Sequence, residues 1–120
     1  MKVRCIQLID GMGNKVTSSP WVRLGDVYHV LAIWIDPKQT RFRLVGGREA
    51  SPVLYDPEMF ELVSTVIPPS WIVTSLQAGC FALEPEPWTQ RGFWEEFFDG
   101  EPNAVACFER ERQKIIDSDP

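Results

Sequence analysis

Short apolar runs separated by turn-forming residues fill the first two thirds of the chain. Residues 2–10 alternate in polarity, which predicts a strand with one face mostly buried. Residues 27–35, VYHVLAIWI, are β-branched, aromatic and apolar on both faces except at His29, and they predict the strongest strand. The turn sequence DPKQT follows, and residues 41–45 alternate again, so the two runs should pair as a hairpin.

Turn signals recur about every ten residues as far as residue 85, with a Gly, Asn, Ser and Pro-rich loop at 11–20. Further strands are expected at 52–55, 60–65, 72–76 and 80–85, and a tight helical turn at 56–60. The last two strands can form a hairpin. Many short strands at this spacing indicate a small, strongly bent antiparallel sheet or barrel.

Helical spacing replaces this pattern in the last third. Thr89 is the expected N-cap of a short helix, with Trp88 and Phe93 at the spacing of a hydrophobic staple. Gly92 would lie inside that helix, at a cost of about 1 kcal/mol relative to Ala. The apolar face of this helix is predicted to consist of Trp94, Phe97 and Phe98.

A second helix is expected over residues 101–116, with Asp99 as a candidate cap. The last four residues, 117–120, are expected to fray. The residues predicted on or near the buried face of this helix are Val105, Phe108, Arg112, Ile115 and Ile116.

Length and composition favour one globular domain over residues 1–120. No run approaches the roughly 18 apolar residues that a membrane span needs, and the N-terminus lacks the features of a signal peptide. We therefore expect a cytoplasmic protein that does not enter a membrane.

The three cysteines, Cys5, Cys80 and Cys107, form no C-x-x-C pair and are expected to be free thiols.

The net charge of −5 hides an asymmetry between the two parts of the chain. Residues 1–50 hold eight Lys and Arg against four Asp and Glu, whereas residues 51–120 hold four against thirteen. An acidic second part repels phosphates, and it favours association with a basic partner through long-range attraction.

Candidate catalytic and metal-binding groups are sparse. The single histidine, His29, lies in the middle of an apolar strand, and no ligand spacing of a metal site occurs. Acid–base chemistry by a carboxylate pair is an alternative that would draw on Glu84, Glu86, Glu95, Glu96 and Asp99. We expect no enzyme activity, no cofactor, no metal and no small-molecule substrate.

Acidic and aromatic residues are concentrated in the segment FWEEFFDGE. Carboxylates next to ring edges suit a basic protein partner, because charge steers the encounter and aromatic anchors hold the complex. The predicted partner-binding residues are Glu95, Glu96, Asp99 and Glu101, with Trp88 or Trp94 as the aromatic anchor. A merely solvated acidic face remains the alternative.

A nucleic-acid interface is a second alternative, on the hairpin at 41–48. Arg41, Arg43 and Arg48 lie near Trp34 and Phe42 in the sequence, the combination that a single-strand binder needs. The acidic balance of the whole chain argues against it.

Residues 21–64 contain the spaced motifs G-x-x-Y-x-V, x-F-x-L and P-x-x-Y-x-x-x-x-F-E-x-V. The matching positions are Gly25, Tyr28, Val30, Phe42, Leu44, Pro52, Tyr55, Phe60, Glu61 and Val63. This pattern resembles that of small bacterial and phage proteins with an SH3-like barrel, and the resemblance implies that fold.

The remaining segments, PPSW, PEPW and GFWEEFFDGEPNAVACFERE, resemble the C-terminal part of small bacterial proteins. Some of those are immunity proteins of polymorphic and contact-dependent toxin systems, and this resemblance implies inhibition by binding.

The sequence thus predicts an α+β protein: a five-stranded SH3-like antiparallel barrel over residues 1–66, then a β-hairpin and two short C-terminal helices over 67–120. The expected function is that of an immunity or inhibitor protein that covers the basic active surface of a toxin. A structural or adaptor SH3-like interaction domain is the alternative.

Overall fold

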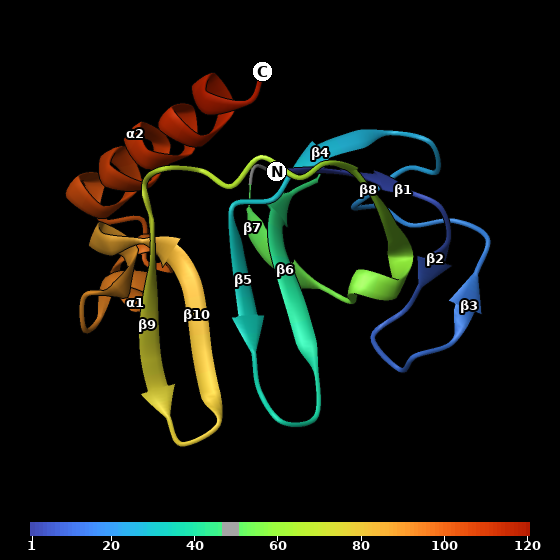
Figure 1. Ribbon diagram of the computed structural model, residues 1–120, viewed down its shortest axis with the longest axis horizontal. Helices are drawn as coiled ribbons and strands as arrows, with labels where there is room; N and C mark the ends of the chain where they lie inside the picture. Colours follow the sequence, from blue (N-terminus) through green and yellow to red (C-terminus); the bar gives the residue numbers. More distant parts are fainter. Residues whose placement is uncertain (47–50) are drawn as a thin grey trace.

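The computed structural model describes residues 1–46 and 51–120, and it shows an α+β protein with antiparallel strands and two C-terminal helices (Figure 1). The strands are β1 (Lys2–Cys5), β2 (Leu8–Ile9), β3 (Lys15–Val16), β4 (Val27–His29), β5 (Ala32–Ile35), β6 (Thr40–Val45), β7 (Pro52–Tyr55), β8 (Phe60–Ser64), β9 (Trp71–Gln77) and β10 (Cys80–Pro85). The helical elements are the 3₁₀ turns η1 (Pro57–Met59) and η2 (Glu86–Thr89) and the helices α1 (Phe93–Phe98) and α2 (Pro102–Ser118).

The strands form two main sheets. One has the order β4-β1-β8, and the other has the order β7-β6-β5-β10-β9. A small ladder pairs β2, from the end of the strand expected at residues 2–10, with β3, which lies in the segment 11–20 that was expected to be a loop. Within the described residues the two main sheets are not closed into a barrel by strand pairing, so the predicted closed barrel over 1–66 is not confirmed. The large sheet also takes two of its strands from beyond residue 66.

The predicted long strand at 27–35 is interrupted at Val30 and Leu31. Its first part, β4, pairs with β1, and its second part, β5, pairs with β6 and β10. The amide of Val30 donates to the Met1 carbonyl (3.0 Å), and that of Leu31 donates to the Arg43 carbonyl (2.8 Å). Both side chains are fully buried at this corner, which explains why the run is apolar on both faces.

Several predicted elements are confirmed. The strands at 41–45 and 52–55 are present, and the segments at 72–76 and 80–85 form the expected hairpin. The turn before β6 is held by Asp36, whose Oδ1 accepts from the amides of Lys38 and Gln39 (both 2.8 Å). Asp56 caps η1 in the same way, accepting from the amide of Glu58 at 2.9 Å.

The start of the first helix differs from the prediction. Thr89 ends the 3₁₀ turn η2, where its hydroxyl donates to the Glu86 carbonyl (2.7 Å), and α1 begins only at Phe93. Gly92 is the N-cap, with φ of 82°, rather than a helical residue. Glycine adopts this left-handed conformation at little cost, so Gly92 occupies the N-cap position that was predicted for Thr89.

The second helix is also shifted from its prediction. Asp99 is the C-cap of α1, and Glu101 precedes α2 as its N-cap without a side-chain capping bond. The residues that α2 buries are Ala104, Phe108, Glu111 and Ile115. Of the residues predicted on this face, Val105 is exposed and Arg112 is half-buried. The buried stripe is therefore rotated by about one residue from the predicted one.

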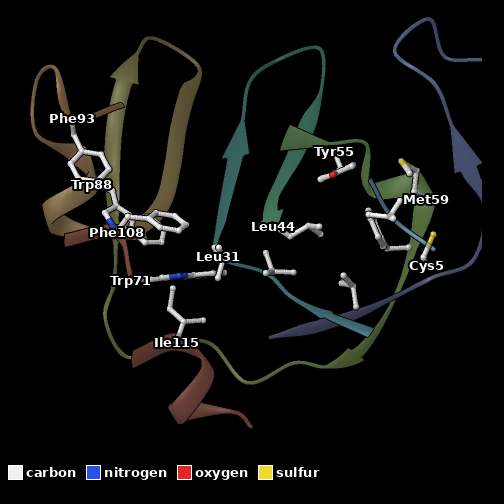
Figure 2. Packing of buried hydrophobic residues seen from close by; sticks show 14 of the residues in the cluster. Cys5, Leu31, Leu44, Tyr55, Met59, Trp71, Trp88, Phe93, Phe108 and Ile115 are labelled. Atoms are coloured by element: carbon white, nitrogen blue, oxygen red, sulfur yellow. The ribbon is translucent and has the colours of Figure 1, made fainter. Parts of the chain in front are cut away.

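One hydrophobic cluster connects the sheets to the helices (Figure 2). It runs from Cys5, Tyr55 and Met59 through Leu31 and Leu44 to the aromatic layer under the helices. That layer contains Trp71, Trp88, Phe93 and Phe108. The Trp88 and Phe108 rings stack with centroids 5.0 Å apart.

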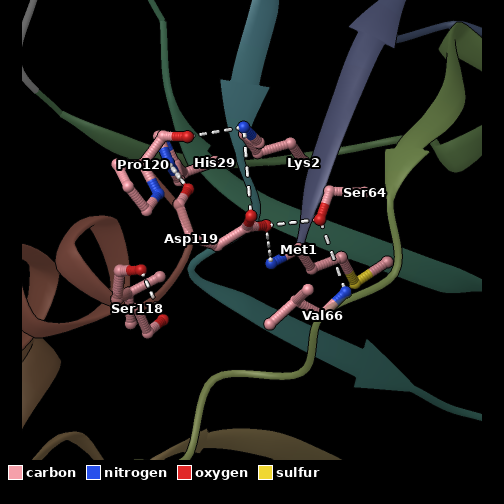
Figure 3. A network of polar contacts seen from close by, with 9 residues as sticks. Met1, Lys2, His29, Ser64, Val66, Ser118, Asp119 and Pro120 are labelled. Atoms are coloured by element: carbon pink, nitrogen blue, oxygen red, sulfur yellow. Dashed lines mark hydrogen bonds and ion pairs between the residues drawn. The ribbon is translucent and has the colours of Figure 1, made fainter.

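The C-terminal residues are anchored on the three-stranded sheet rather than frayed (Figure 3). The Asp119 carboxylate lies 3.0 Å from the amino group of Met1 and accepts from the Ser64 hydroxyl at 2.5 Å. The Asp119 carbonyl lies 2.7 Å from Nε2 of His29, and Lys2 Nζ donates to the Pro120 carbonyl at 2.8 Å. In the part of the chain that is described, no helix is long and apolar enough to cross a bilayer.

Candidate functional site

Four exposed carboxylates gather where α1 meets α2, and we call Glu95, Glu96, Asp99 and Glu101 the acidic junction. Two backbone hydrogen bonds fold this turn tightly: the Asp99 amide donates to the Glu95 carbonyl and the Glu101 amide to the Glu96 carbonyl, each at 3.0 Å. The four predicted acidic residues are therefore brought together on one turn of chain.

None of the four carboxylates lies within 4 Å of a lysine, arginine or histidine nitrogen in residues 1–46 and 51–120. Glu95 and Glu96 lie in the first turn of α1, where a negative charge interacts favourably with the positive end of the helix dipole. Asp99 lies at the opposite end of the same helix, where its charge opposes the dipole. Helix stability thus accounts for the two glutamates and not for Asp99.

The two candidate anchor tryptophans differ in accessibility. Trp88 is 1% exposed beneath α2, so in this conformation its ring is out of reach of a partner. Trp94 is half-buried between α1 and the large sheet. The accessible ring of the acidic junction is that of Phe98, which is 58% exposed and lies 6.0 Å from the Trp94 ring.

Sequence reasoning placed Phe98 on the buried face of α1. Phe93, Trp94, Phe97 and Phe98 cannot all face inward from a helix of six residues, and Phe98 is the one left outside. The run of four rings in six positions is the signal that could have identified an exposed aromatic residue.

Buried charges hold α1 against the large sheet. Arg43 of β6 is 5% exposed, and its guanidinium carbon lies 3.9 Å from the centre of the Trp94 ring. Nη1 of Arg43 donates to the Pro52 carbonyl (3.1 Å). Burial lowers the pKa of Arg43 to about 10, against the opposing effect of Glu84, so the side chain is still protonated at neutral pH.

Glu84 of β10 is the second buried charge in this layer, at 3% exposure. Its Oε2 accepts from the Trp34 indole N–H at 2.9 Å. Burial raises the pKa of Glu84, while the hydrogen bond from Trp34 and the charge of Arg43 act in the opposite direction. The layer between sheet and helices therefore contains a carboxyl, a guanidinium and two indoles in place of a purely apolar contact.

The described part of the arginine hairpin at 41–48 does not present a basic surface. Arg43 is buried, and Arg41 lies 4.0 Å from the carboxylate of Asp56 and donates to Gln39. Arg48 falls outside the described residues. Since a buried guanidinium cannot reach a phosphate, the described part of this hairpin offers a nucleic acid only one, partly neutralised, arginine.

A cavity of about 490 Å³ lies between the β2–β3 ladder and β7, with Trp21, Tyr55 and Asp10 among its lining residues. Burial raises the pKa of Tyr55 to about 12, so its hydroxyl stays protonated. Asp10 accepts from the amides of Met12 and Asn14 (both 2.9 Å), which engages it in the local turn. Tyr55 therefore lines this cavity as a protonated phenol, and Asp10 as a carboxylate that holds a local turn.

The carboxylates considered for acid–base chemistry differ in environment: Glu84 is buried, whereas Glu95, Glu96 and Asp99 lie together and exposed in the acidic junction. His29 Nε2 contacts the Asp119 carbonyl. Within the described ranges, no three histidine, cysteine, aspartate or glutamate side chains are grouped as metal ligands. Cys5, Cys80 and Cys107 are free thiols.

Comparison with protein-family models, with curated proteins and with solved structures finds no match for this chain.

Proposed function

We propose that this protein binds a basic protein partner through the acidic junction, with Phe98 as the accessible aromatic anchor. The observation that carries the proposal is that four exposed carboxylates have no cation partner in the described residues and lie beside a largely exposed ring. Unpaired charge favours rapid association with an oppositely charged surface, and a ring that leaves water on binding slows dissociation.

The form of this function that we favour is immunity to a toxin. A toxin that cleaves nucleic acid has a basic active surface, and carboxylates can occupy the positions where phosphates would bind. Inhibition of this kind needs no catalytic residue, cofactor or metal in the inhibitor. An inhibitor of such a toxin would work in the cytoplasm, where the toxin would act.

The second candidate is an SH3-like interaction domain. The division of one strand run into β4 and β5 on two sheets, and the 3₁₀ turn η1 before β8, support an opened SH3-like arrangement carrying an added hairpin and helices. In this case the contact surface would be the cavity beside Trp21, whose side chain is partly exposed.

A charge-reversal experiment tests the first candidate. The protein is immobilised, the partner is captured from lysate of the source organism, identified and purified, and its Kd is then measured by calorimetry. The test variant is Glu95→Lys/Glu96→Lys/Asp99→Lys, which leaves Glu101 in place because it precedes α2. The matched control is Asp26→Lys/Glu58→Lys/Asp117→Lys, three exposed acids outside the acidic junction that form no ion pair within the described residues. Each triple reversal changes the formal net charge from −5 by 6, to +1.

We expect the test variant to raise the Kd at least about tenfold and the control to change it by about twofold or less. Phe98→Ala should also weaken binding, with little dependence on salt. If both triple variants bind equally well, the acidic junction is solvated surface. If only variants around Trp21 weaken binding, the second candidate is the correct one.

A further inference from the structure

The longest uncharged stretch of the chain contains the edge strand β9 of the large sheet. Residues 62–83 contain no Asp, Glu, Lys, Arg or His, although 24% of the whole chain is charged. This stretch includes β9 and runs into β10. Its exposed large apolar side chains are Leu62, Val63, Val66, Ile67, Ile72, Val73, Leu76 and Phe81.

β9 is the last strand of the five-stranded sheet, at the left end of that sheet in Figure 1. One of its edges pairs with β10, and among the described residues no strand pairs with the other edge. Natural proteins usually protect such an edge with charges, prolines or a short strand. β9 has seven residues, WIVTSLQ, with no charge and no proline. Its ladder with β10 is regular from Trp71 to Ser75 and shifts register beyond Ser75, so the unpaired backbone groups of the regular part are available to another strand.

We infer that β9 pairs with β9 of a second copy of this chain, in antiparallel orientation about a two-fold axis at Thr74. This register aligns the β9 strands of the two copies along their length and places Ile72 opposite the Leu76 of the other copy. These two side chains lie on one face of the strand, and they are 39% and 47% exposed in the single chain. Each copy contributes the same surface, as a two-fold interface requires, and the two sheets become one.

Charge favours a second copy over a basic partner at this edge. Each copy has a formal charge of −5, so two copies repel through most of their surfaces. Contact through the uncharged β9 edge brings no charged side chains of that strand face to face. A basic partner would gain no electrostatic attraction from it, and the acidic junction lies on different elements, so this inference does not depend on the proposed function.

Sedimentation velocity of the full chain at rising concentration tests the inference. Wild type should shift from the 13.7 kDa monomer towards twice that mass. Ile72→Lys/Leu76→Lys should remain monomeric, because lysines would face lysines across the axis. Ile72→Lys/Leu76→Glu should dimerise, because each lysine would then face a glutamate. The control Met12→Lys/Leu24→Lys, with the same added charge at exposed apolar positions elsewhere, should dimerise like wild type.

Three results would overturn the inference: a wild type that stays monomeric up to about 1 mM, a double-lysine β9 variant that dimerises like wild type, or a lysine–glutamate variant that stays monomeric. Should the double-lysine variant fail to fold, hydrogen exchange on wild type decides. Amides of β9 should exchange more slowly at high than at low protein concentration, and an unchanged rate there would also rule out the pairing.

Discussion

The guanidinium of Arg43 lies against the face of the Trp94 ring, with its central carbon 3.9 Å from the ring centre. Arg43 comes from β6 and Trp94 from α1, so this contact joins the helix that carries Glu95 and Glu96 of the acidic junction to the large sheet. Because α1 has only six residues, it is too short to be stable alone, and this contact is part of what holds it in place.

Replacement of Arg43 by Met should lower the free energy of unfolding by about 2 kcal/mol. The variant loses a desolvated cation–π contact and leaves Glu84 buried without its nearest positive charge. Urea denaturation followed by tryptophan fluorescence measures the change.

The double variant Arg43→Met/Glu84→Gln provides the control, because it removes both buried charges together. It should be more stable than Arg43→Met alone. A double variant that is less stable than the single one would show that the Glu84 charge is not the source of the loss.

Glu84→Gln should change how stability depends on pH. Burial raises the pKa of Glu84 above its ordinary value of 4.5, so the folded state binds this proton more tightly than the unfolded state. Wild type therefore loses part of its stability as pH rises from about 4.5 through the raised pKa. The variant lacks this contribution, so its stability relative to wild type should increase over that pH range, as measured by urea denaturation at several pH values. A difference that stays constant with pH would contradict the assignment.

Asp119→Asn should lower the thermal midpoint at neutral pH. The Ser64 hydroxyl, followed by the amino group of Met1 and by Lys2, lowers the pKa of Asp119 below its ordinary value of 3.8. The resulting stabilisation is present above about pH 4 and is lost as pH falls through the lowered pKa. Melts of variant and wild type should therefore differ at pH 7, and the difference should shrink as pH falls through the lowered pKa. Equal melts at pH 7 would show that the C-terminal anchor adds nothing to stability.

Two glycines should respond differently to alanine. Gly92 has a φ of 82° but open space around it, so Gly92→Ala should cost about 1 kcal/mol for the backbone conformation alone. At Gly46 an added Cβ would lie 2.0 Å from the Trp21 carbonyl oxygen, so the backbone there must move. Gly46→Ala should therefore be the more destabilising substitution, on the order of 3 kcal/mol. Denaturation of both variants side by side checks the order.

Local turn chemistry explains which elements the sequence could predict. Asp36 and Asp56 each hold a turn with their own side chains, so the hairpin before β6 and the turn η1 are encoded in adjacent residues. The interruption at Val30 and Leu31 has no such signal. It is fixed by amide contacts to Met1 and Arg43, residues that are distant along the chain.

In the candidate site, too, some features could be predicted from the sequence and others depend on contacts between distant residues. Acidic side chains are rarely buried without a partner, so the exposure of the acidic junction followed from residue type alone. The burial of Trp88 depends on Phe108, and that of Arg43 depends on Trp94. A charged residue in a strand is normally expected at the protein surface. Arg43 is buried instead because α1 packs over it through Trp94.

The polar network around Asp119 brings the two ends of the chain to one place, with Lys2 bonded to the Pro120 carbonyl. A short flexible linker from Pro120 to Met1 would therefore convert the chain into a ring without moving either sheet. Such closure restricts the unfolded chain far more than the folded one, and it raises stability through the entropy of the unfolded state. The same proximity makes the protein suitable for circular permutation, with new ends placed in the β9–β10 turn.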